Sequence, residues 1–445
     1  MRARALASCL FAVTAACGGA MSKPGSRVYV ASNAPPPPPP MPAEVAEQVA
    51  AAPTPTSTTA VAIATPTPTP PAIAAPAETP TGDTHAAYTP NPWIETERDR
   101  LSTFAADVDT AAYTYARRTL VGGSLPPAAS VRVEEFVNAF KYRFGAPTDG
   151  PFAVVMDAAP SPFDTRHHIV RVGVATSSKT NAQRAPMNLV FLVDVSGSMS
   201  SADKLGLAQE SLRHLVRSLG PDDRVSLVTY AGSTEVVLAS TSGADHRAIL
   251  AGIDRLSAGG STAMGSGLAL AYEQALAKTS RHGQRRVIVL SDGDANVGPS
   301  SVDEMLKIID AGVKQGVTLS TIGFGMGNYR ADLMEQLGDR GNGNNYYVDS
   351  PAASEKLFTR DLVSMLEVAA KDVKLQVEFD PAVVARYRLL GYENRDIADA
   401  DFRVDSVDAG EIGVGHQVTA LYEVTLTAKA RQTTPLGVVR IRHKA

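Results

Sequence analysis

Cysteine is nearly absent from this chain of 445 residues: there are two, Cys9 and Cys17, and both lie among the first twenty residues. No thiol remains beyond them for a disulfide framework, a structural zinc site or a cysteine nucleophile. Stability must therefore come from a packed hydrophobic core. The roughly 350 residues that follow the first hundred are numerous enough to form one.

Aromatic residues and an excess of basic charge are also lacking. Aromatic side chains make up 6% of the chain, and 42 Lys and Arg residues are outnumbered by 46 Asp and Glu residues, for a net charge of −4. A nucleic-acid-binding protein is expected to carry a basic face and aromatic platforms for the bases. The composition therefore argues against nucleic acid as a partner. Beyond the N-terminus, no apolar run is long enough to span a membrane.

Proline, in contrast, is concentrated in one segment: 18 of the 30 prolines lie between residues 18 and 92, including the run Pro35–Pro40. Proline fixes φ and lacks the backbone N–H, so this stretch cannot build a sheet or a long helix. We expect residues 17–92 to form a disordered, polyproline-like linker. A tether that holds a folded domain away from a membrane is favoured over a PxxP recognition motif.

The first residues are typical of a bacterial export signal. Two arginines precede a short apolar stretch, Ala5–Ala16, which falls well short of the about 20 residues needed to cross a bilayer. The tetrapeptide TAAC, which ends at Cys17, resembles the lipobox of bacterial lipoproteins. The resemblance implies that residues 1–16 are a signal peptide and that Cys17 is lipidated. The alternative is a secretory signal cut after Ala16 or Ala20.

The residues after the expected anchor suggest a location. Cys17 is followed by Gly18 and Gly19 rather than by aspartate. In a Gram-negative bacterium this favours sorting to the outer membrane. We therefore expect an exported lipoprotein of the cell envelope that is attached to the membrane only through its lipid.

Residues 93–186 are expected to form an N-terminal region of helices and strands. A helical pattern runs from residue 93 to about 138, and strand patterns cover 152–156 and 168–174. Two features of this region were considered as functional motifs, and both have simpler explanations.

The first feature is the pair Asp107 and Asp109, which resembles the start of a phosphatase aspartate motif but lacks the buried strand that such a motif needs before it. We interpret these residues as acidic groups at a helix N-terminus. The second is the pair His167 and His168. Adjacent residues on a strand point to opposite faces, so the two histidines are not expected to share a metal ion.

Residues 187–370 alternate strand and helix patterns. The strand segments include continuous apolar runs such as LVFLV and VIVL, and the segments between them place apolar residues at helical spacing. This alternation indicates a parallel sheet covered on both faces, that is, a doubly wound, Rossmann-like α/β domain. The expected strands are 188–193, 224–230, 234–238, 286–290, 317–324 and 346–348. The expected helices are 204–219, 245–256, 264–277, 302–315, 331–337 and 354–369.

The final segment, residues 371–445, contains strand patterns only, such as VKLQVEF and VTALYEVTLTA. We expect it to form a β-rich domain. Together with the strands at 152–156 and 168–174, it is predicted to form a β-sandwich into which the α/β domain is inserted.

Five oxygen-bearing side chains lie where the predicted sheet would bring them together. Asp194, Ser196 and Ser198 directly follow the strand NLVFLV, Thr262 lies in a glycine-rich loop before a helix, and Asp292 follows the strand VIVL. In a doubly wound sheet, the loops at the carboxyl ends of the strands meet at a topological switch point, where ligands bind. Carboxylates and hydroxyls without thiolates favour Mg²⁺, Mn²⁺ or Ca²⁺ over zinc or copper.

The same five residues resemble the metal-ion-dependent adhesion site of von Willebrand factor type A (VWA) domains. The resemblance implies that Ser196, Ser198 and Thr262 bind the metal directly or through water. Asp194 and Asp292 would act largely through water and balance the charge. Mg²⁺ is the favoured ion, and its remaining coordination position would be free for a carboxylate of a protein partner.

The resemblance extends over roughly residues 97–427 to bacterial YfbK-like lipoproteins that carry this domain. Members of that family usually continue beyond the last strands, so we expect a shortened or incomplete C-terminal region here. The stretches that carry the resemblance are FAADVDTAAY, LPPAASVRVEEFVNAF, NLVFLVDVSGSM, VTYAGST, GFGMGNY, MEQLGDRGNGNNYYVD and DAGEIGVGHQVTALYEV.

Other chemistry finds little support. The spacing of Asp292, Asp294 and Asn296 resembles an EF-hand loop, but Val297 stands in place of its glycine and Asp303 in place of its glutamate. There is no G-x-S-x-G elbow and no phosphate-binding loop. We therefore expect a binding protein, not an enzyme. A structural envelope scaffold stiffened by the metal is one alternative, and a metal-dependent hydrolase is a weaker one.

Overall fold

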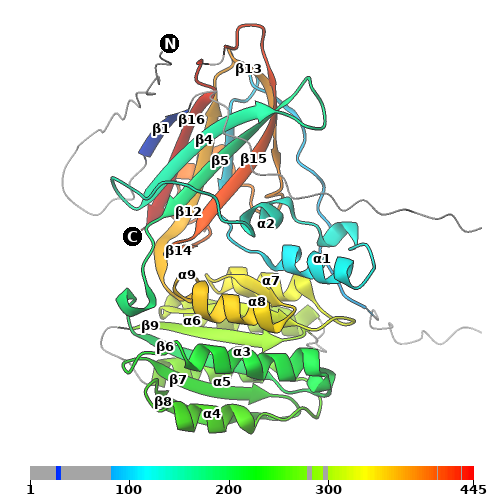
Figure 1. Cartoon of the computed structure of the whole chain (residues 1–445), viewed down its shortest axis with the longest axis vertical. Helices are drawn as coiled ribbons and strands as arrows, with labels where there is room; N and C mark the ends of the chain where they lie inside the picture. The colour runs from blue at the N-terminus through cyan, green and yellow to red at the C-terminus, as the bar shows by residue number, and fades with distance from the viewer. Residues whose placement is uncertain are drawn as a thin grey trace, which may run out of the picture.

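The computed structural model describes residues 27–31, 82–277, 283–293, 299–407, 409–431 and 433–444. The expected signal peptide, Cys17 and the proline run 35–40 lie outside these residues. The described chain forms an α/β domain and a β-sandwich, with two helices, α1 (Ala111–Val121) and α2 (Val133–Asn138), at their junction (Figure 1).

The α/β domain is built on one six-stranded sheet with the order β11-β10-β9-β6-β7-β8. Neighbouring strands are parallel, except for β8, which runs antiparallel to β7. Every residue of the central strand β6 is buried. The strands are β6 (Met187–Asp194), β7 (Arg224–Tyr230), β8 (Thr234–Ser242), β9 (Gln284–Ser291), β10 (Val317–Phe324) and β11 (Asn345–Val348).

Helices cover both faces of this sheet. Along β6, Leu189 and Phe191 pack into a core with α3, α4 and α9, whereas Val190 and Leu192 pack on the other face with α5, α6 and α7. The prediction of a doubly wound α/β domain is therefore confirmed. The helices are α3 (Leu207–Val216), α4 (His246–Asp254), α5 (Met264–Ala277), α6 (Pro299–Lys314), α7 (Ala331–Arg340), α8 (Pro351–Glu355) and α9 (Leu362–Leu366).

The second unit is a sandwich of two five-stranded sheets that share one hydrophobic core. One sheet has the order β1-β16-β12-β14, with β3 also paired to β12, and the other has the order β2-β13-β15-β5-β4. Its strands are β1 (Arg27–Ala31), β2 (Ile94–Glu95), β3 (Leu101–Ala105), β4 (Phe152–Pro160), β5 (His168–Thr176), β12 (Val368–Phe379), β13 (Val384–Leu390), β14 (Ile412–Gly413), β15 (Gln417–Leu426) and β16 (Gly437–Lys444).

The α/β domain is inserted between two strands of this sandwich. β5 ends at Thr176 and β12 begins at Val368, and the intervening chain contains the whole six-stranded sheet. β15 returns to pair with β5, so that Val418 lies opposite Val174. The predicted insertion, including the contribution of the strands near 152–156 and 168–174, is confirmed.

Three local predictions were wrong. The first is the helical pattern from residue 93, because residues 94–95 and 101–105 are strands of the sandwich. The sequence LSTFA alternates in polarity too briefly to be distinguished from a helix start, and its pairing with β12 decides the outcome. The helical pattern is correct for α1 and α2.

The second correction concerns the expected linker 17–92. Residues 27–31 form β1, antiparallel to β16. The segment RVYVA is rich in β-branched and aromatic residues and contains no proline. Near its other end, the linker contacts the folded body: Asp83 accepts hydrogen bonds from the backbone N–H groups of Gly327 and Tyr329, both at 2.7 Å.

The third correction concerns the expected helix 354–369. Helix α8 ends at Glu355, a π-helical turn follows over Lys356–Arg360, and α9 ends at Leu366. The chain then enters β12 directly, since its apolar side chains are needed in the sandwich core. Among the described helices, none combines the length and the apolar character needed to cross a bilayer.

Candidate metal centre

Both predicted aspartates lie at the carboxyl edge of the central strands. Asp194 is the last residue of β6, and Asp292 follows β9 directly; both are fully buried, at 0% exposure. β6 and β9 are parallel neighbours, with Val193 opposite Leu290. Ser291 extends this pairing, because its hydroxyl donates to Asp194 Oδ2 at 2.8 Å. The two aspartates therefore enter the same edge of the sheet side by side.

The other three predicted residues come from loops that contact each other. Ser196 and Ser198 lie in the turn after β6, and their hydroxyl oxygens are 3.0 Å apart. The loop that carries Thr262 is joined to this turn by two backbone hydrogen bonds, from Gly197 N to Gly260 O at 3.0 Å and from Gly259 N to Val195 O at 2.7 Å. The structure thus brings the three loops together, while their role as metal ligands stays a prediction.

Asp194 is held by donors on both of its oxygens. The backbone N–H of Ser196 donates to Oδ1 at 2.9 Å, and the buried hydroxyl of Tyr230 donates to Oδ2 at 3.1 Å. Burial raises the pKa of Asp194 to about 6, the hydrogen bonds from Ser196 oppose this rise, and the nearby charge of Asp292 adds to it. Burial also raises the pKa of Tyr230 well above its usual range, which keeps that group a hydrogen-bond donor.

Asp292 has two partners that the sequence analysis did not identify. Lys204 Nζ lies 2.9 Å from Asp292 Oδ2, and Asn328 Nδ2 donates to the same oxygen at 3.1 Å. Lys204 Nζ also donates to Asn328 Oδ1 at 2.6 Å. The sequence pattern predicts only that Lys204 begins an amphipathic helix. No motif spacing indicates that its side chain reaches the end of β9.

The donor set fits a hard divalent cation. Two carboxylates and three hydroxyls provide only oxygen ligands, as Mg²⁺ prefers. The burial that disfavours the ionised form of Asp194 would be offset by a bound cation. The residues present would therefore hold such an ion at the edge of the sheet.

The pair His167 and His168 does not form a metal site in the described part of the chain. His167 Nδ1 lies 2.8 Å from Glu423 Oε1, and burial lowers the pKa of His168. Over the described ranges, no three His, Cys, Asp or Glu side chains are grouped so that they could hold a metal ion. Of the EF-hand-like spacing, Asp294 and Asn296 lie outside the described residues.

The interpretation of Asp107 and Asp109 as helix-capping acids was wrong. Helix α1 begins at Ala111, its N-cap residue Thr110 makes no side-chain capping hydrogen bond, and the backbone N–H of Ala112 donates to Glu135 Oε2 at 2.8 Å. Instead, Asp107 Oδ2 lies 3.0 Å from Arg395 Nε, and Asp109 Oδ1 accepts a hydrogen bond from the backbone N–H of Asn345 at 2.9 Å. Both aspartates are buried between the sandwich and the α/β domain.

These aspartates belong to a larger group that we call the interdomain carboxylate cluster. On α7 of the α/β domain, Asp339 lies 2.6 Å from Arg395, and Glu335 lies 3.1 Å from Arg132. Arg132 also lies 2.6 Å from the buried Glu134. The cluster comprises six carboxylates and two guanidinium groups: Asp107, Asp109, Glu134, Glu135, Glu335, Asp339, Arg132 and Arg395.

Burial dominates the electrostatics of this cluster. It raises the pKa of Asp109 and of Glu135 well above their usual values, and neighbouring carboxylates add to the rise. The pKa values of Glu335 and Asp339 are also raised by burial, although the two arginines oppose this effect. Burial therefore disfavours the ionised form of several acids at the junction of the two units.

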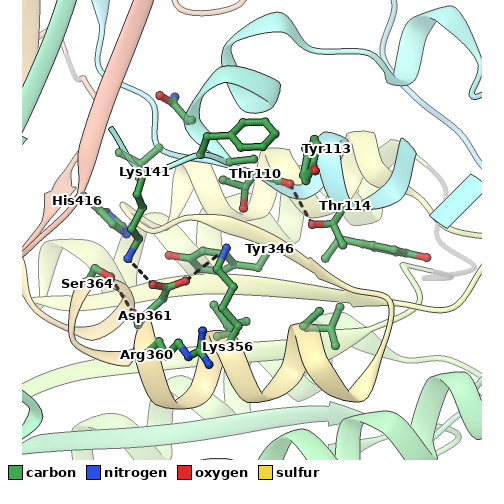
Figure 2. A pocket seen from close by; sticks show the side chains of 18 of the residues that line it. Thr110, Tyr113, Thr114, Lys141, Tyr346, Lys356, Arg360, Asp361, Ser364 and His416 are labelled. Carbon is green, nitrogen blue, oxygen red and sulfur yellow. Dashed lines mark hydrogen bonds and ion pairs between the residues drawn. The ribbon is translucent and has the colours of Figure 1, made fainter. Parts of the chain in front are cut away.

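A cavity of about 410 Å³ lies on another side of the same junction, between α1, the segment after α2, the α8–α9 region and the turn before β15. Figure 2 shows Lys141 and Lys356 both directed at Asp361, with Nζ–Oδ distances of 2.6 and 3.8 Å. Burial lowers the pKa of His416 to about 4, so this side chain is neutral at pH 7. The carboxylate of Asp361 is thus balanced by two lysines, which come from two different walls of the cavity.

Three family models match the chain. A model described as von Willebrand factor type A domain matches residues 188–360, one described as von Willebrand factor matches 79–171, and one described as the C-terminal part of uncharacterized protein YfbK matches 364–443. Together with the doubly wound sheet and its strand-end loops, these matches define a protein with a VWA domain.

Similar curated proteins specify the kind of VWA protein. The chain is 41% identical over 350 residues to the uncharacterized protein YfbK of Escherichia coli K12. The matched region covers 76% of this chain and 60% of that relative. It is 25% identical over 284 residues to the uncharacterized protein sll0103 of Synechocystis, which covers 63% of this chain and 66% of that relative. The chain is a YfbK-like VWA protein, and it spans 60% of the length of the Escherichia coli relative.

Among solved structures, a von Willebrand factor type A protein from Catenulispora acidiphila matches with a TM-score of 0.42 and 17% sequence identity. The match covers 66% of this chain and 70% of that protein.

Proposed function

We propose that this protein is a metal-dependent protein-binding module of the bacterial cell envelope. A VWA domain supports an interaction or adhesion role, and the proposal adds the chemistry of that interaction. A divalent cation, with Mg²⁺ favoured, is held by Asp194, Ser196, Ser198, Thr262 and Asp292, and it captures an acidic side chain of a partner protein.

The observation that carries this proposal is the meeting of three loops at the carboxyl edge of β6 and β9. Each loop supplies oxygen donors, and the backbone hydrogen bonds from Gly197 and Gly259 hold two of the loops together. If these residues served only as separate turns and caps, nothing would require their loops to converge. A converged set of oxygen donors is what a hard cation needs.

The bound cation would supply a Lewis-acidic position for an anionic oxygen of the partner. The chain's own residues orient that position. Tyr230 and Ser291 fix the carboxylate of Asp194, and Lys204 with Asn328 fixes that of Asp292. None of these groups is arranged as a general base beside a nucleophile, so we propose binding rather than catalysis.

The envelope location rests on the lipobox-like TAAC sequence and the proline-rich segment behind it. We propose that Cys17 carries a lipid and that the following segment is a tether. Cys17→Ser should prevent incorporation of a labelled fatty acid and release the protein in soluble form. A Cys9→Ser variant, which leaves the lipobox intact, is the matched control. Membrane retention of Cys17→Ser in high salt would contradict the lipid anchor.

The binding proposal is tested by capture of a partner from a bacterial envelope fraction on the immobilised protein. Capture should need Mg²⁺ or Mn²⁺, and it should weaken in Thr262→Ala, which removes one hydroxyl ligand and leaves both aspartates. Thr241→Ala, at a half-buried position on β8 where the hydroxyl donates only to the nearby carbonyl of Ala239 in the hydrogen bonds described, is the control.

Two results would overturn this proposal. Equal capture in excess chelator would favour a structural scaffold. Metal-dependent turnover of a phosphate or peptide substrate, lost in Thr262→Ala, would favour a hydrolase.

A further inference from the structure

A lysine is built into the proposed metal centre. Lys204 Nζ lies 2.9 Å from Asp292 Oδ2 and 2.6 Å from Asn328 Oδ1, while Asn328 Nδ2 donates to the same Asp292 oxygen. The three groups form a closed triangle of hydrogen bonds. The side chain of Lys204 is 9% exposed, so its ammonium group is largely removed from water.

The stem of Lys204 is fixed as well as its head. Gly325, with φ +72°, lies against the methylene groups, and a Cβ at this position would collide with them. Lys204 belongs to a π-helical turn, Ala202–Gly206, and its neighbour Asp203 forms an ion pair with Arg118. π-helical turns often occur at functional sites. Lys204 is therefore held at Asp292 from several directions.

The fixed ammonium changes the charge of the site. Asp194 and Asp292 supply two negative charges when ionised, and Lys204 returns one positive charge. With a divalent cation the site would carry one net positive charge, and one incoming carboxylate would neutralise it. Without Lys204, the metal alone would neutralise the site, and a carboxylate would leave it negative.

We propose that Lys204 is the residue that makes this centre select an anionic ligand: it weakens the hold on the cation and strengthens the hold of the loaded centre on a carboxylate. This inference rests on the proposed metal centre and deepens it by naming the residue that sets its charge. The physical basis is that charges a few ångströms apart in a poorly hydrated site are only weakly screened.

The experiment uses the full chain and two neutral variants, Lys204→Met and Lys204→Gln. Met keeps an unbranched stem without the charge, and Gln ends in a neutral polar group. Isothermal titration with Mn²⁺ alone measures the affinity for the cation. The affinity for a carboxylate is measured by titrating the Mn²⁺-loaded protein with acetate, with the relaxation rate of water protons as the signal. Acetamide serves as the neutral probe.

Both variants should bind Mn²⁺ about tenfold more tightly than the wild type, and their Mn²⁺-loaded forms should bind acetate about tenfold more weakly. Binding of acetamide should not change. Lys307→Met, at an exposed lysine on α6, should match the wild type in every titration.

The outcomes separate this inference from the proposed function. If Mn²⁺ binds neither the wild type nor the variants, the metal centre itself is wrong. If Mn²⁺ binds all of them equally, or if the neutral variants bind acetate as well as the wild type does, the role of Lys204 is overturned and the metal centre stands. Should one variant fail to fold, the other still decides between these results.

Discussion

The candidate metal centre and the interdomain carboxylate cluster both bury acidic side chains, and they balance the negative charge in different ways. At the candidate metal centre, one lysine lies beside two buried aspartates, which leaves one negative charge for the proposed cation to balance. In the cluster, six carboxylates face two arginines, and burial shifts several of them toward the protonated form. One site is suited to exchange a ligand, and the other is suited to join two units.

The origin of the residues explains this difference. The metal centre is built from loops of one sheet, so its residues share one rigid frame. The cluster is assembled from α7 of the VWA domain, the segment before α1, the N-terminal part of α2 and the loop after β13. Removal of the proposed metal ion should therefore affect ligand binding at the first site. Loss of an arginine should affect the attachment of the two units at the second.

The largest expected effect comes from Arg395→Leu in the cluster. Arg395 lies 3.0 Å from Asp107 and 2.6 Å from Asp339, and its loss leaves carboxylates without their cation. We expect the free energy of unfolding to fall by about 3–5 kcal/mol, measured by urea denaturation.

Arg340→Leu is the matched control for Arg395→Leu, because Arg340 follows Asp339, the partner of Arg395, on helix α7 and forms a more exposed ion pair with Asp310. Its loss should cost about 0–1 kcal/mol. Equal losses in the two variants would show that the cluster contributes no more than a surface pair.

The next effect is the response to metal. Adding Mg²⁺ to chelated protein at a hundred times its dissociation constant should stabilise the fold by about 2.7 kcal/mol and raise the Tm. Asp194→Ala should abolish this gain, and Arg395→Leu should keep it, because the two sites share no partner. The measurement is a thermal melt with and without chelator.

Asp254→Ala, at an exposed aspartate paired with Arg213, is the control for the thermal melts. If the Tm of the wild type does not change when Mg²⁺ is added, the proposed metal centre is wrong.

The smallest effect is the pH dependence of stability. The folded cluster keeps protons on Asp109 and Glu135 that the unfolded chain releases above about pH 4. Stability should therefore fall as the pH rises from about 4 toward the raised pKa values, by at most about 1.4 kcal/mol per pH unit for each proton. Urea denaturation at several pH values between about 4.5 and 8 measures the slope of the unfolding free energy against pH.

The double variant Asp109→Asn, Glu135→Gln should show a flatter slope than the wild type, because the amides keep the backbone contacts and cannot titrate. Glu304→Gln, at an exposed position on α6, should keep the slope of the wild type. An unchanged slope in the double variant would mean that these two acids are ionised in the folded protein.

The residues of the metal centre that could be predicted are those next to strong local signals. Asp194 and Asp292 directly follow buried apolar strands, so the strand periodicity fixes where they lie. Lys204 could not be found in this way. Its direction depends on a π-helical turn, and its partner Asn328 lies in a distant loop.

The cluster escaped prediction for a related reason. Asp107 and Asp109 precede a helix, which is the usual context of capping acids. Their actual partners, Arg395 and Asn345, are more than 200 residues away in the sequence and meet them only in the folded protein. The short strands at 94–95 and 101–105 were missed because pairing with β13 and β12, not local periodicity, defines them.

The insertion of the VWA domain also determines an order of folding. The six-stranded sheet and its helices lie within residues 187–366, so this domain can be complete as soon as Leu366 has been synthesised. In the sandwich, Ala175 of β5 must wait for Gln417 of β15, across the whole insert. Pairings between such distant segments form slowly, and an unpaired strand edge can recruit wrong partners. We therefore expect the VWA domain to fold first, and the β4–β5 hairpin to wait with an unpaired edge until β15 has been synthesised.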